Sequence, residues 1–285
     1  MKTLRKEITE RKVKIAGMGR AIGGRKLQFK NQIRYRLMSG ESLLDLAEAA
    51  ARQALEAASM GIEDIDIIVC AMATPLQAIP CNAALVHERI AKGLDIPAMD
   101  INTTCTSFLS AVDIFSSLVD NGRYERVLIL SGDTASAALN PRQPESYELF
   151  SDGAAACVLV HADKGENSAV LYGRQKTWSE GAHDTEIRGG CGLMTAFCMN
   201  EENREEIRLV VPHQASRALE MIMPRLGFAE GTYIDRVAQY GNLVSASVPF
   251  VLCKAIEEEK VKRGDMILLM GTAAGLTVNL LLMRY

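Results

Sequence analysis

The sequence has no long apolar run. Its longest runs, such as "VLILSG" and "MILLMG", are far shorter than the roughly 20 residues that a membrane-spanning helix needs. The N-terminal stretch "MKTLRKEITERK" also lacks the apolar core of a secretory signal. These absences exclude a helical membrane span, and we expect a cytoplasmic protein.

The seven cysteines lack the paired spacing of a disulfide framework or a zinc site, so we expect no metal centre and reduced, mostly buried thiols. The net charge of −3 argues against a general nucleic-acid binder. Basic residues nevertheless dominate residues 1–36. This segment is either a cationic surface for a phosphorylated or acidic partner, or a solvated N-terminal segment.

From residue 42 onward, short apolar runs alternate with amphipathic stretches, which is typical of a layered α/β fold built from βαβ units. In the first half we expect helices over 42–60, 82–93 and 107–122, and strands over 65–73, 98–102 and 126–133. In the second half we expect strands over 207–216, 236–242 and 265–275, and helices over 216–227 and 247–264.

The two halves repeat one unit. The stretches 98–133 and 235–271 share the order strand, polar loop, helix, basic turn and strand at nearly matching lengths, which indicates an internal duplication. We therefore expect an N-terminal half over 1–165 and a C-terminal half over 166–285. Cys105, His213 and Asn242 all lie in strand-to-helix loops, where open α/β sheets bind their ligands.

Each of these three residues has a structural alternative. Cys105 precedes a helix whose positive end would favour the nucleophilic thiolate, yet a free cysteine is often only a buried hydrophobe. His213 follows an apolar strand, and Asn242 follows a glycine in a turn, where asparagine is common for backbone reasons. Together, a thiol, an imidazole and a carboxamide make a thioester site that could stabilise an enolate or an oxyanion. We expect Cys70, Cys157 and Cys253 to be core residues.

Five stretches carry a resemblance to a known family: "DINTTCTSF", "ELFSDGAAACVLV", "LVVPHQASR", "YGNLVSASVP" and "GTAAGLTVN". Their order and spacing resemble the β-ketoacyl-acyl-carrier-protein synthase III family of the thiolase superfamily over about residues 35 to 285. The resemblance implies a five-layer αβαβα fold of two similar halves and a homodimer. It also implies a site made of Cys105, His213 and Asn242.

The implied reaction is a decarboxylative Claisen condensation, in fatty-acid or related acyl or polyketide biosynthesis. Cys105 would take an acyl group from an acyl-CoA or other thioester, with the backbone N–H groups of Cys105 and Ala274 as the oxyanion hole. A malonyl thioester on an acyl carrier protein would then lose carbon dioxide beside His213 and Asn242 and condense with the acyl group. The resemblance implies no metal or redox cofactor; coenzyme A or phosphopantetheine thioesters would be substrates.

This sequence departs from the family pattern in several places. Tyr240 replaces a histidine before the "GN" turn, and Ala273, Ala274 and Gly275 replace a glycine triplet. The tryptophan segment that helps to hold coenzyme A is absent, which leaves Arg34 and Arg36 in that region. The interval between Asp152 and His213 is shortened by roughly one long helix.

Substrate and partner contacts can be predicted only from these matches. Ile79 falls where an aromatic side chain often lines the partner subunit's acyl pocket, and its smaller size would admit a longer or branched chain, unless Ile79 only packs at the interface. Arg217 and the basic N-terminal region could contact an acidic carrier protein. Two alternatives stay open: an acyltransferase or non-decarboxylating condensing enzyme of the same fold, or a non-catalytic subunit of a heterodimer.

Overall fold

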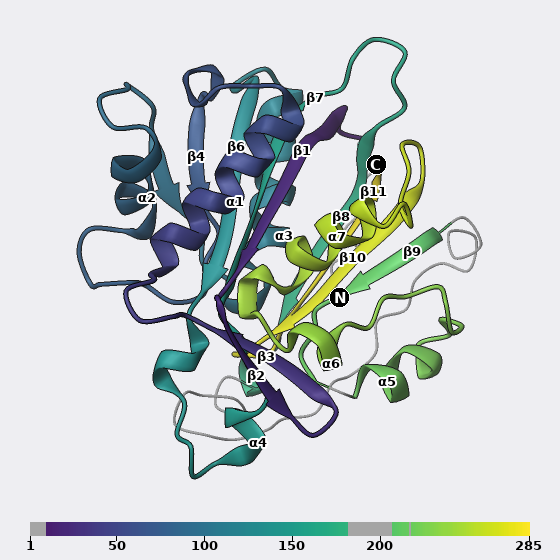
Figure 1. Cartoon of the computed structure of the whole chain (residues 1–285). Coiled ribbons are helices and arrows are strands. Elements are labelled where there is room, and N and C mark those ends of the chain that lie inside the picture. The colour runs from purple at the N-terminus through teal and green to yellow at the C-terminus, as the bar shows by residue number, and fades with distance from the viewer. Residues whose placement is uncertain (1–9, 182–206, 217) are drawn as a thin grey trace.

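The computed structural model describes residues 10–181, 207–216 and 218–285 of the 285-residue chain. A five-stranded sheet occupies the first half, in the order β1-β7-β6-β4-β5 (Figure 1). β4 runs parallel to both β5 and β6, whereas β7 is antiparallel to β6 and β1. The strands are β1 (Val13–Ile22), β4 (Ile67–Cys70), β5 (Ala98–Asp100), β6 (Arg126–Asp133) and β7 (Gly153–His161).

A four-stranded sheet occupies the second half, in the order β8-β11-β10-β9. β10 is parallel to β9 and antiparallel to β11, which in turn is antiparallel to β8. Its strands are β8 (Ala169–Thr177), β9 (Ile207–Pro212), β10 (Met266–Ala273) and β11 (Thr277–Arg284). A separate hairpin of β2 (Arg25–Phe29) and β3 (Gln32–Arg36) follows β1.

The helices complete five layers, αβαβα, as the family resemblance implies. Helices α1 and α2 cover the outer face of the first sheet, α3 and α7 lie between the two sheets, and α5 covers the outer face of the second. The helices are α1 (Leu43–Ala58), α2 (Asn82–Ile90), α3 (Ser107–Asp120), α4 (Pro144–Tyr147), α5 (Leu219–Arg225), α6 (Val237–Tyr240) and α7 (Ser247–Glu257).

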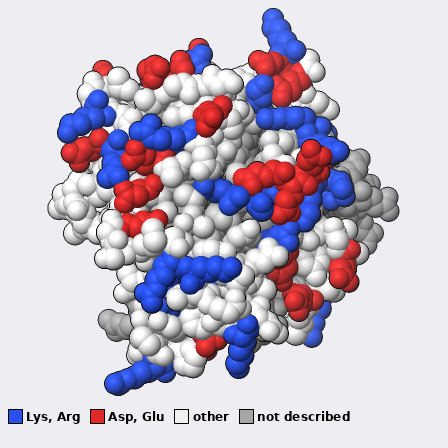
Figure 2. All heavy atoms as spheres, viewed as in Figure 1, with Lys and Arg blue, Asp and Glu red and all other residues white. Residues whose placement is uncertain are grey.

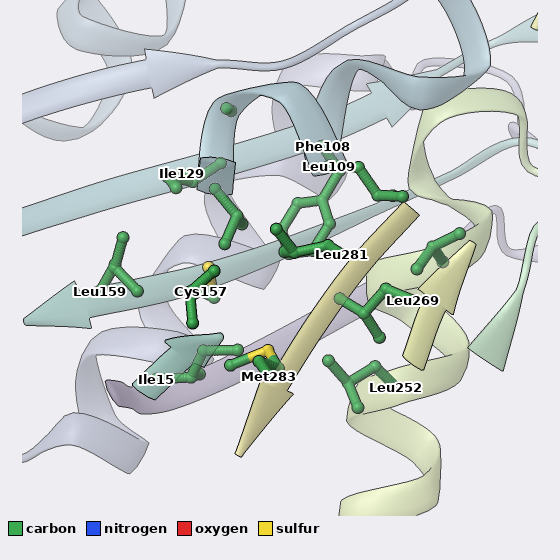
Figure 3. Close-up of a cluster of buried hydrophobic side chains, with 14 of the residues drawn as sticks. Ile15, Phe108, Leu109, Ile129, Cys157, Leu159, Leu252, Leu269, Leu281 and Met283 are labelled. Atoms are coloured by element: carbon green, nitrogen blue, oxygen red, sulfur yellow. The ribbon is translucent and has the colours of Figure 1, made fainter. Parts of the chain in front are cut away.

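The largest apolar cluster lies between the two sheets. Phe108 and Leu109 of α3 pack there against side chains from both sheets, such as Ile129 of β6 and Leu269 of β10 (Figure 3). Each fully buried side chain of this size contributes about 1.5–3 kcal/mol to folding. The central helices are therefore held rigidly, and so are the loops at their N-termini.

Most of the predicted elements are present, and one is wrong. Residues 236–242 do not form a strand, because the chain turns into the short helix α6 at Val237–Tyr240. The strand position beside β9 is taken instead by a single parallel bridge between Val210 and Tyr233. The Arg34 guanidinium binds the carbonyl oxygens of Val237 (3.0 Å) and Ala238 (3.5 Å), which a continuing ladder would otherwise use.

Two expectations drawn from composition can also be compared with the structure. Among the described residues, no helix is long and apolar enough to cross a membrane. Cys70, Cys157 and Cys253 are buried as free thiols, as predicted for core residues. The described part of the basic N-terminal stretch forms β1 and the β2–β3 hairpin.

Candidate active site

The turn that carries Cys105 is a strained elbow at the start of α3. After β5 the chain passes through the short 3₁₀ turn η2 (Thr104–Thr106) directly into α3. Thr104 has a φ of +53°, which is uncommon for a residue with a side chain. Two hydrogen bonds hold this conformation: Thr104 N–H donates to Asn102 Oδ1 (2.9 Å) and Thr103 N–H donates to Ser107 Oγ (3.0 Å).

The second half contains the same elbow, 140 residues later. Val244 has a φ of +53°, and its N–H donates to Asn242 Oδ1 (2.8 Å). Leu243 N–H donates to Ser247 Oγ (2.9 Å), after which the 3₁₀ turn η6 (Val244–Ala246) leads into α7. The predicted duplication is thus confirmed down to single hydrogen bonds, and Asn242 is the counterpart of Asn102.

β10 brings the Cys105 elbow next to His213. A Cβ atom placed on Gly271 would lie 3.1 Å from Thr106 Cγ2 and 3.6 Å from His213 Cβ. Thr106 and His213 therefore both border the small space beside Gly271 in β10. The equivalent residue in β6 is Ser131, which has a side chain at this position.

Cys105 is half-buried, and its thiol is protonated in the resting state. Burial and the nearby negative charge of Asp133 raise the pKa of the Cys105 thiol to about 12, although hydrogen bonds from the backbone N–H groups of Cys105 and Ala274 lower it in part. The expectation that the helix N-terminus alone favours the thiolate is therefore wrong for the resting site, because desolvation outweighs the helix dipole. Both backbone donors nonetheless lie at the Cys105 sulfur.

His213 is a neutral imidazole in this structure. Burial lowers its pKa to about 4. Its backbone N–H donates to Met270 O (2.8 Å), which fixes the residue at the end of β9. The Nδ1 atom is buried and has no hydrogen-bond partner among the described residues. At neutral pH one ring nitrogen carries a proton and can donate a hydrogen bond while the other can accept a proton, and the tautomer decides which nitrogen has which role.

Asn242 joins the histidine loop to the second elbow. Its Nδ2 donates to Ala215 O (3.3 Å), and its backbone N–H donates to Leu149 O (3.0 Å). Gln214 fixes the same loop from the other side, since its Nε2 donates to Pro212 O (2.8 Å) and its Oε1 accepts from Arg236 N–H (2.6 Å). In the sequence motif "HQA", His213 is thus the candidate reactive residue, and Gln214 is the residue whose hydrogen bonds hold the loop in place.

Ala274 lies in the tight turn between β10 and β11. Gly275 has a φ of +81° in this turn, so a glycine is required there, whereas the preceding two positions accommodate alanine. A methyl group at residue 274 leaves its backbone N–H free to donate. The replacement of a glycine triplet by alanines is therefore compatible with an oxyanion hole.

Arg34 and Arg36 are committed inside the fold, which corrects their expected role as substrate or carrier contacts. Arg34 is fully buried, and its Nε donates to Glu148 O (2.7 Å). Arg36 is 8% exposed, donates from Nη2 to Tyr147 O (2.8 Å) and stacks on the Tyr147 ring. These guanidinium groups hold α4 and α6, and with them the Asn242 loop, because carbonyl oxygens rather than substrate phosphates are their ligands.

The remaining predicted contacts lie in different places. Tyr240 packs its ring on Phe250 (5.1 Å between centroids) and on Tyr35 (6.2 Å), directly before the Gly241 turn. Ile79 is 85% exposed, in the loop between β4 and α2. Arg217 and residues 182–206 of the shortened interval before His213 lie outside the described residues.

The sequence reasoning missed Asp133. This aspartate ends β6, is fully buried, and acts on the Cys105 thiol through its charge. Its signal was present in the sequence, because Asp133 is the polar residue that follows the apolar strand "VLILSG", the same position that singled out His213. Its contacts with the second elbow depend on the packing of distant segments and could not be predicted.

Comparisons with known proteins agree with this geometry. Residues 99–174 match the family model of 3-oxoacyl-[acyl-carrier-protein (ACP)] synthase III, and residues 199–285 match the model of its C terminal. The chain is similar to β-ketoacyl-[acyl-carrier-protein] synthase III of Aquifex aeolicus, with 32% identity over 272 residues that cover 88% of this chain and 86% of the relative. The enzyme of the same name from Clostridium perfringens (strain ATCC 13124) is 33% identical over 83% of each chain.

Solved structures give the same fold. The crystal structure of the Aquifex aeolicus 3-oxoacyl-[acyl-carrier-protein] synthase III superimposes with a TM-score of 0.84 at 26% identity, over 96% of this chain and 100% of that one. Xanthomonas campestris OleA bound with cerulenin has the same TM-score at 20% identity, over 97% and 98% of the two chains, which shows the shared thiolase-like fold alone. With this site in this fold, the chain belongs to the β-ketoacyl-[acyl-carrier-protein] synthase III family and is a condensing acyltransferase.

Proposed function

We propose that this protein is a decarboxylating 3-oxoacyl synthase that uses Cys105, His213 and Asn242. The observation that carries the proposal is the position of the Cys105 sulfur. Two backbone N–H groups, those of Cys105 and Ala274, reach the sulfur, and the loops of His213 and Asn242 are hydrogen-bonded to one another beside it. A nucleophile, a pair of oxyanion donors and two polar side chains therefore converge from four loops.

In the first half-reaction, Cys105 attacks the carbonyl carbon of an acyl thioester. Because the resting thiol holds its proton, a base must accept that proton as the C–S bond forms, and neutral His213 is the available imidazole. The N–H groups of Cys105 and Ala274 stabilise the tetrahedral oxyanion. The donor thiolate leaves with a proton, and Cys105 becomes a thioester.

In the second half-reaction, a malonyl thioester on an acyl carrier protein loses carbon dioxide. The electron pair of the broken C–C bond moves into an enolate, whose oxygen accepts hydrogen bonds from His213 and the Asn242 carboxamide. The enolate carbon then attacks the acyl group on Cys105, and the Cys105 thiolate leaves and is protonated. The product is a 3-oxoacyl thioester on the carrier.

One experiment separates this reaction from its alternatives. The protein is incubated with a panel of acyl-CoA and acyl-carrier thioesters, and its intact mass is recorded before and after malonyl-carrier protein is added. We expect an acyl adduct that is lost in Cys105→Ala and discharged as 3-oxoacyl product. The exposed Cys81→Ser is the matched control and should acylate normally.

Other outcomes would contradict the proposal. An adduct that only an amine or alcohol discharges would identify an acyltransferase, and a product formed from two acyl chains without malonyl loss would identify a non-decarboxylating enzyme. The absence of an adduct across the whole panel would favour a non-catalytic subunit.

We further propose that the carrier protein docks on the β2–β3 hairpin. Arg25, Lys26 and Lys30 are exposed there, and no ion pair to an acidic residue is found for them among the described residues. Lys and Arg side chains cover this lower part of the surface with little acidic surface between them (Figure 2). β3 packs on the Asn242 region through Arg34, so the hairpin borders the site.

The hairpin proposal is tested by charge reversal. The double variant Arg25→Glu/Lys26→Glu should raise the KM for malonyl-carrier protein and leave acyl transfer from a CoA thioester to Cys105 unchanged. Lys92→Glu, an exposed change just beyond the end of α2, is the control. An unchanged KM in the hairpin variant would refute this docking surface.

Two copies of the chain are proposed to associate through β5. Among the strands of the described residues, β5 lies at the edge of its sheet and pairs with β4. The side chain of Met99, within β5, is 42% exposed. An exposed edge strand with an apolar side chain favours pairing with a second copy across a two-fold axis. Light scattering should give a dimer for the native protein and a monomer for Met99→Asp.

A further inference from the structure

The two elbows differ at the position of the nucleophile. Because equivalent residues lie 140 positions apart, the counterpart of Cys105 in the second elbow is Ser245. The strands before the two turns also correspond, so Asp133 at the end of β6 is the counterpart of Ala273 at the end of β10. One half thus contributes a thiol and a carboxylate where the other contributes a hydroxyl and a methyl group.

These unmatched side chains meet in the interior. Asp133 Oδ2 accepts hydrogen bonds from Ser245 Oγ (2.5 Å) and Ser245 N–H (3.1 Å). Asp133 Oδ1 accepts from Thr74 Oγ1 (2.8 Å) and Thr74 N–H (3.0 Å). The carboxylate is fully buried, and no basic side chain pairs with it in the described part of the chain. It is therefore held by four dipolar donors, and it links the second elbow to the loop after β4.

The second elbow is the segment that places Asn242. Val244 N–H and Ser247 Oγ bind the Asn242 Oδ1 atom, and Ser245 lies between these two donors in the chain. A displacement of Ser245 therefore moves both groups that orient the carboxamide. Asp133 restrains Ser245 through its backbone and its side chain at once, which leaves the elbow little freedom.

Burial raises the pKa of the Asp133 carboxyl above its ordinary value, and the hydrogen bonds from Ser245 and Thr74 act in the opposite direction. Asp152, at the start of the neighbouring strand β7, is the other buried carboxylate near the end of β6. It accepts hydrogen bonds from Leu37 N–H (3.1 Å) and Ser136 N–H (2.9 Å) and has no contact with Ser245.

We propose that Asp133 is a positioning residue of the acyl-transfer reaction, which fixes the Asn242 elbow for the second half-reaction. The proposal rests on the proposed function, because it assigns Asn242 to the condensation step. The restraint itself, two hydrogen bonds from Ser245 to one carboxyl oxygen of Asp133, is a property of the fold and can be tested without the reaction.

The test is Asp133→Asn in the full-length protein. The amide keeps the shape of the side chain but replaces one acceptor oxygen by a donor NH₂ and removes the charge. We expect the condensation rate of pre-acylated enzyme to fall about tenfold or more, as for loss of a catalytic hydrogen-bond geometry. We expect acylation of Cys105 by a CoA thioester to change less than condensation, because the first elbow keeps its own hydrogen bonds.

Ser245→Ala tests the same contact from its other partner. It removes the hydroxyl donor and keeps the Asp133 carboxyl, so condensation should slow while acylation stays close to that of the native protein. Circular dichroism and the melting temperature of both variants show whether they fold. If Asp133→Asn does not fold, Ser245→Ala still decides the positioning role.

Two results would overturn the proposal. A loss of acylation and condensation in equal proportion in Asp133→Asn would leave Asp133 a purely structural residue. A native condensation rate in Ser245→Ala would show that the elbow needs no restraint. If the native protein forms no 3-oxoacyl product, the proposed function fails, and the melting temperatures of Asp133→Asn, Ser245→Ala and the double variant still show whether the two side chains stabilise the elbow together.

Discussion

The two elbows of this protein share one backbone and carry different chemistry. Thr104 and Val244 have the same φ of +53°, and an asparagine oxygen caps each turn in the same way. The first elbow presents the thiol of Cys105, and the second presents the carboxamide of Asn242, while its own Ser245 binds Asp133. A duplicated unit has thus kept its backbone geometry and divided the proposed catalytic groups between its copies.

The difference teaches which features of the unit are structural. The capping asparagine and the serine three residues after the positive-φ residue occur in both halves, so they stabilise the turn itself. The thiol of Cys105, the imidazole of His213 and the carboxyl of Asp133 have no counterpart in the other half, so we assign them to the proposed reaction. This division of roles between the two elbows can be tested by substituting equivalent residues in the two halves and comparing the effects on activity and stability.

The largest effect is expected from the two asparagines. Asn242→Ala should lower the condensation rate about 10²–10³-fold, because it removes a donor to the enolate oxygen, while Cys105 still acylates. Asn102→Ala removes the cap of the first elbow and the hydrogen bond from Asn102 Nδ2 to Ala73 O (2.9 Å), and it should slow acylation by less than this. Single-turnover kinetics of the two half-reactions measure both. Equal losses in the two variants would contradict the division of roles.

The next effect is a pH dependence of stability that belongs to His213. The folded-state pKa is lowered from 6.5 to about 4, so the unfolded chain binds the additional proton between these values. The free energy of unfolding contributed by this residue is fully present above pH 6.5 and is lost as the pH falls toward 4, by about 3 kcal/mol. Urea denaturation of the native protein and His213→Asn at several pH values measures the difference.

That difference should lie within the stated pH window. If the two proteins lose stability in parallel between pH 6.5 and 4, then the imidazole is not buried as a neutral group.

A smaller effect is expected at the glycine that allows the site to close. Gly271→Ala places a methyl group 3.1 Å from Thr106 Cγ2, so Thr106 must shift by a few tenths of an ångström, and 3.6 Å from His213 Cβ, which is an ordinary van der Waals contact. We expect about a tenfold loss of condensation activity with less than about 2 kcal/mol of destabilisation, as for a modestly overpacked core. Ser131→Ala, at the equivalent place in β6, is the control and should leave activity close to native. Similar activities for both variants would contradict the asymmetry.

The smallest effect is expected from the paired serines. Ser107→Ala and Ser247→Ala each remove the acceptor for a backbone N–H in their own elbow, which costs about 1 kcal/mol of unfolding free energy in either half. Ser247→Ala also releases Asn242 Oδ1 and should slow condensation a few-fold, whereas Ser107→Ala should not. Thermal denaturation and the half-reaction assays test this pair. A large difference in stability would argue against equivalent elbows.

Much of the fold could be predicted because its signals are local. Apolar β-branched runs gave the strands, and helical spacing with a cap at Ser42 gave α1, whose capping box is present in the structure. The prediction of a strand over residues 236–242 was wrong because the short apolar pattern of this segment fits a strand or a helix equally well. The deciding contacts come from Arg34, which is about 200 residues away and binds the carbonyls of Val237 and Ala238.

The sequence by itself determined the layered α/β fold, the duplicated unit and the loops in which Cys105, His213 and Asn242 lie, because strand and helix periodicities and turn residues act over a few positions. Only the tertiary structure decided the electrostatics of the site. The raised pKa of Cys105, the lowered pKa of His213 and the contact between Asp133 and Ser245 depend on burial and on charges from distant segments. Desolvation is a property of the whole packed interior, and no local pattern encodes it.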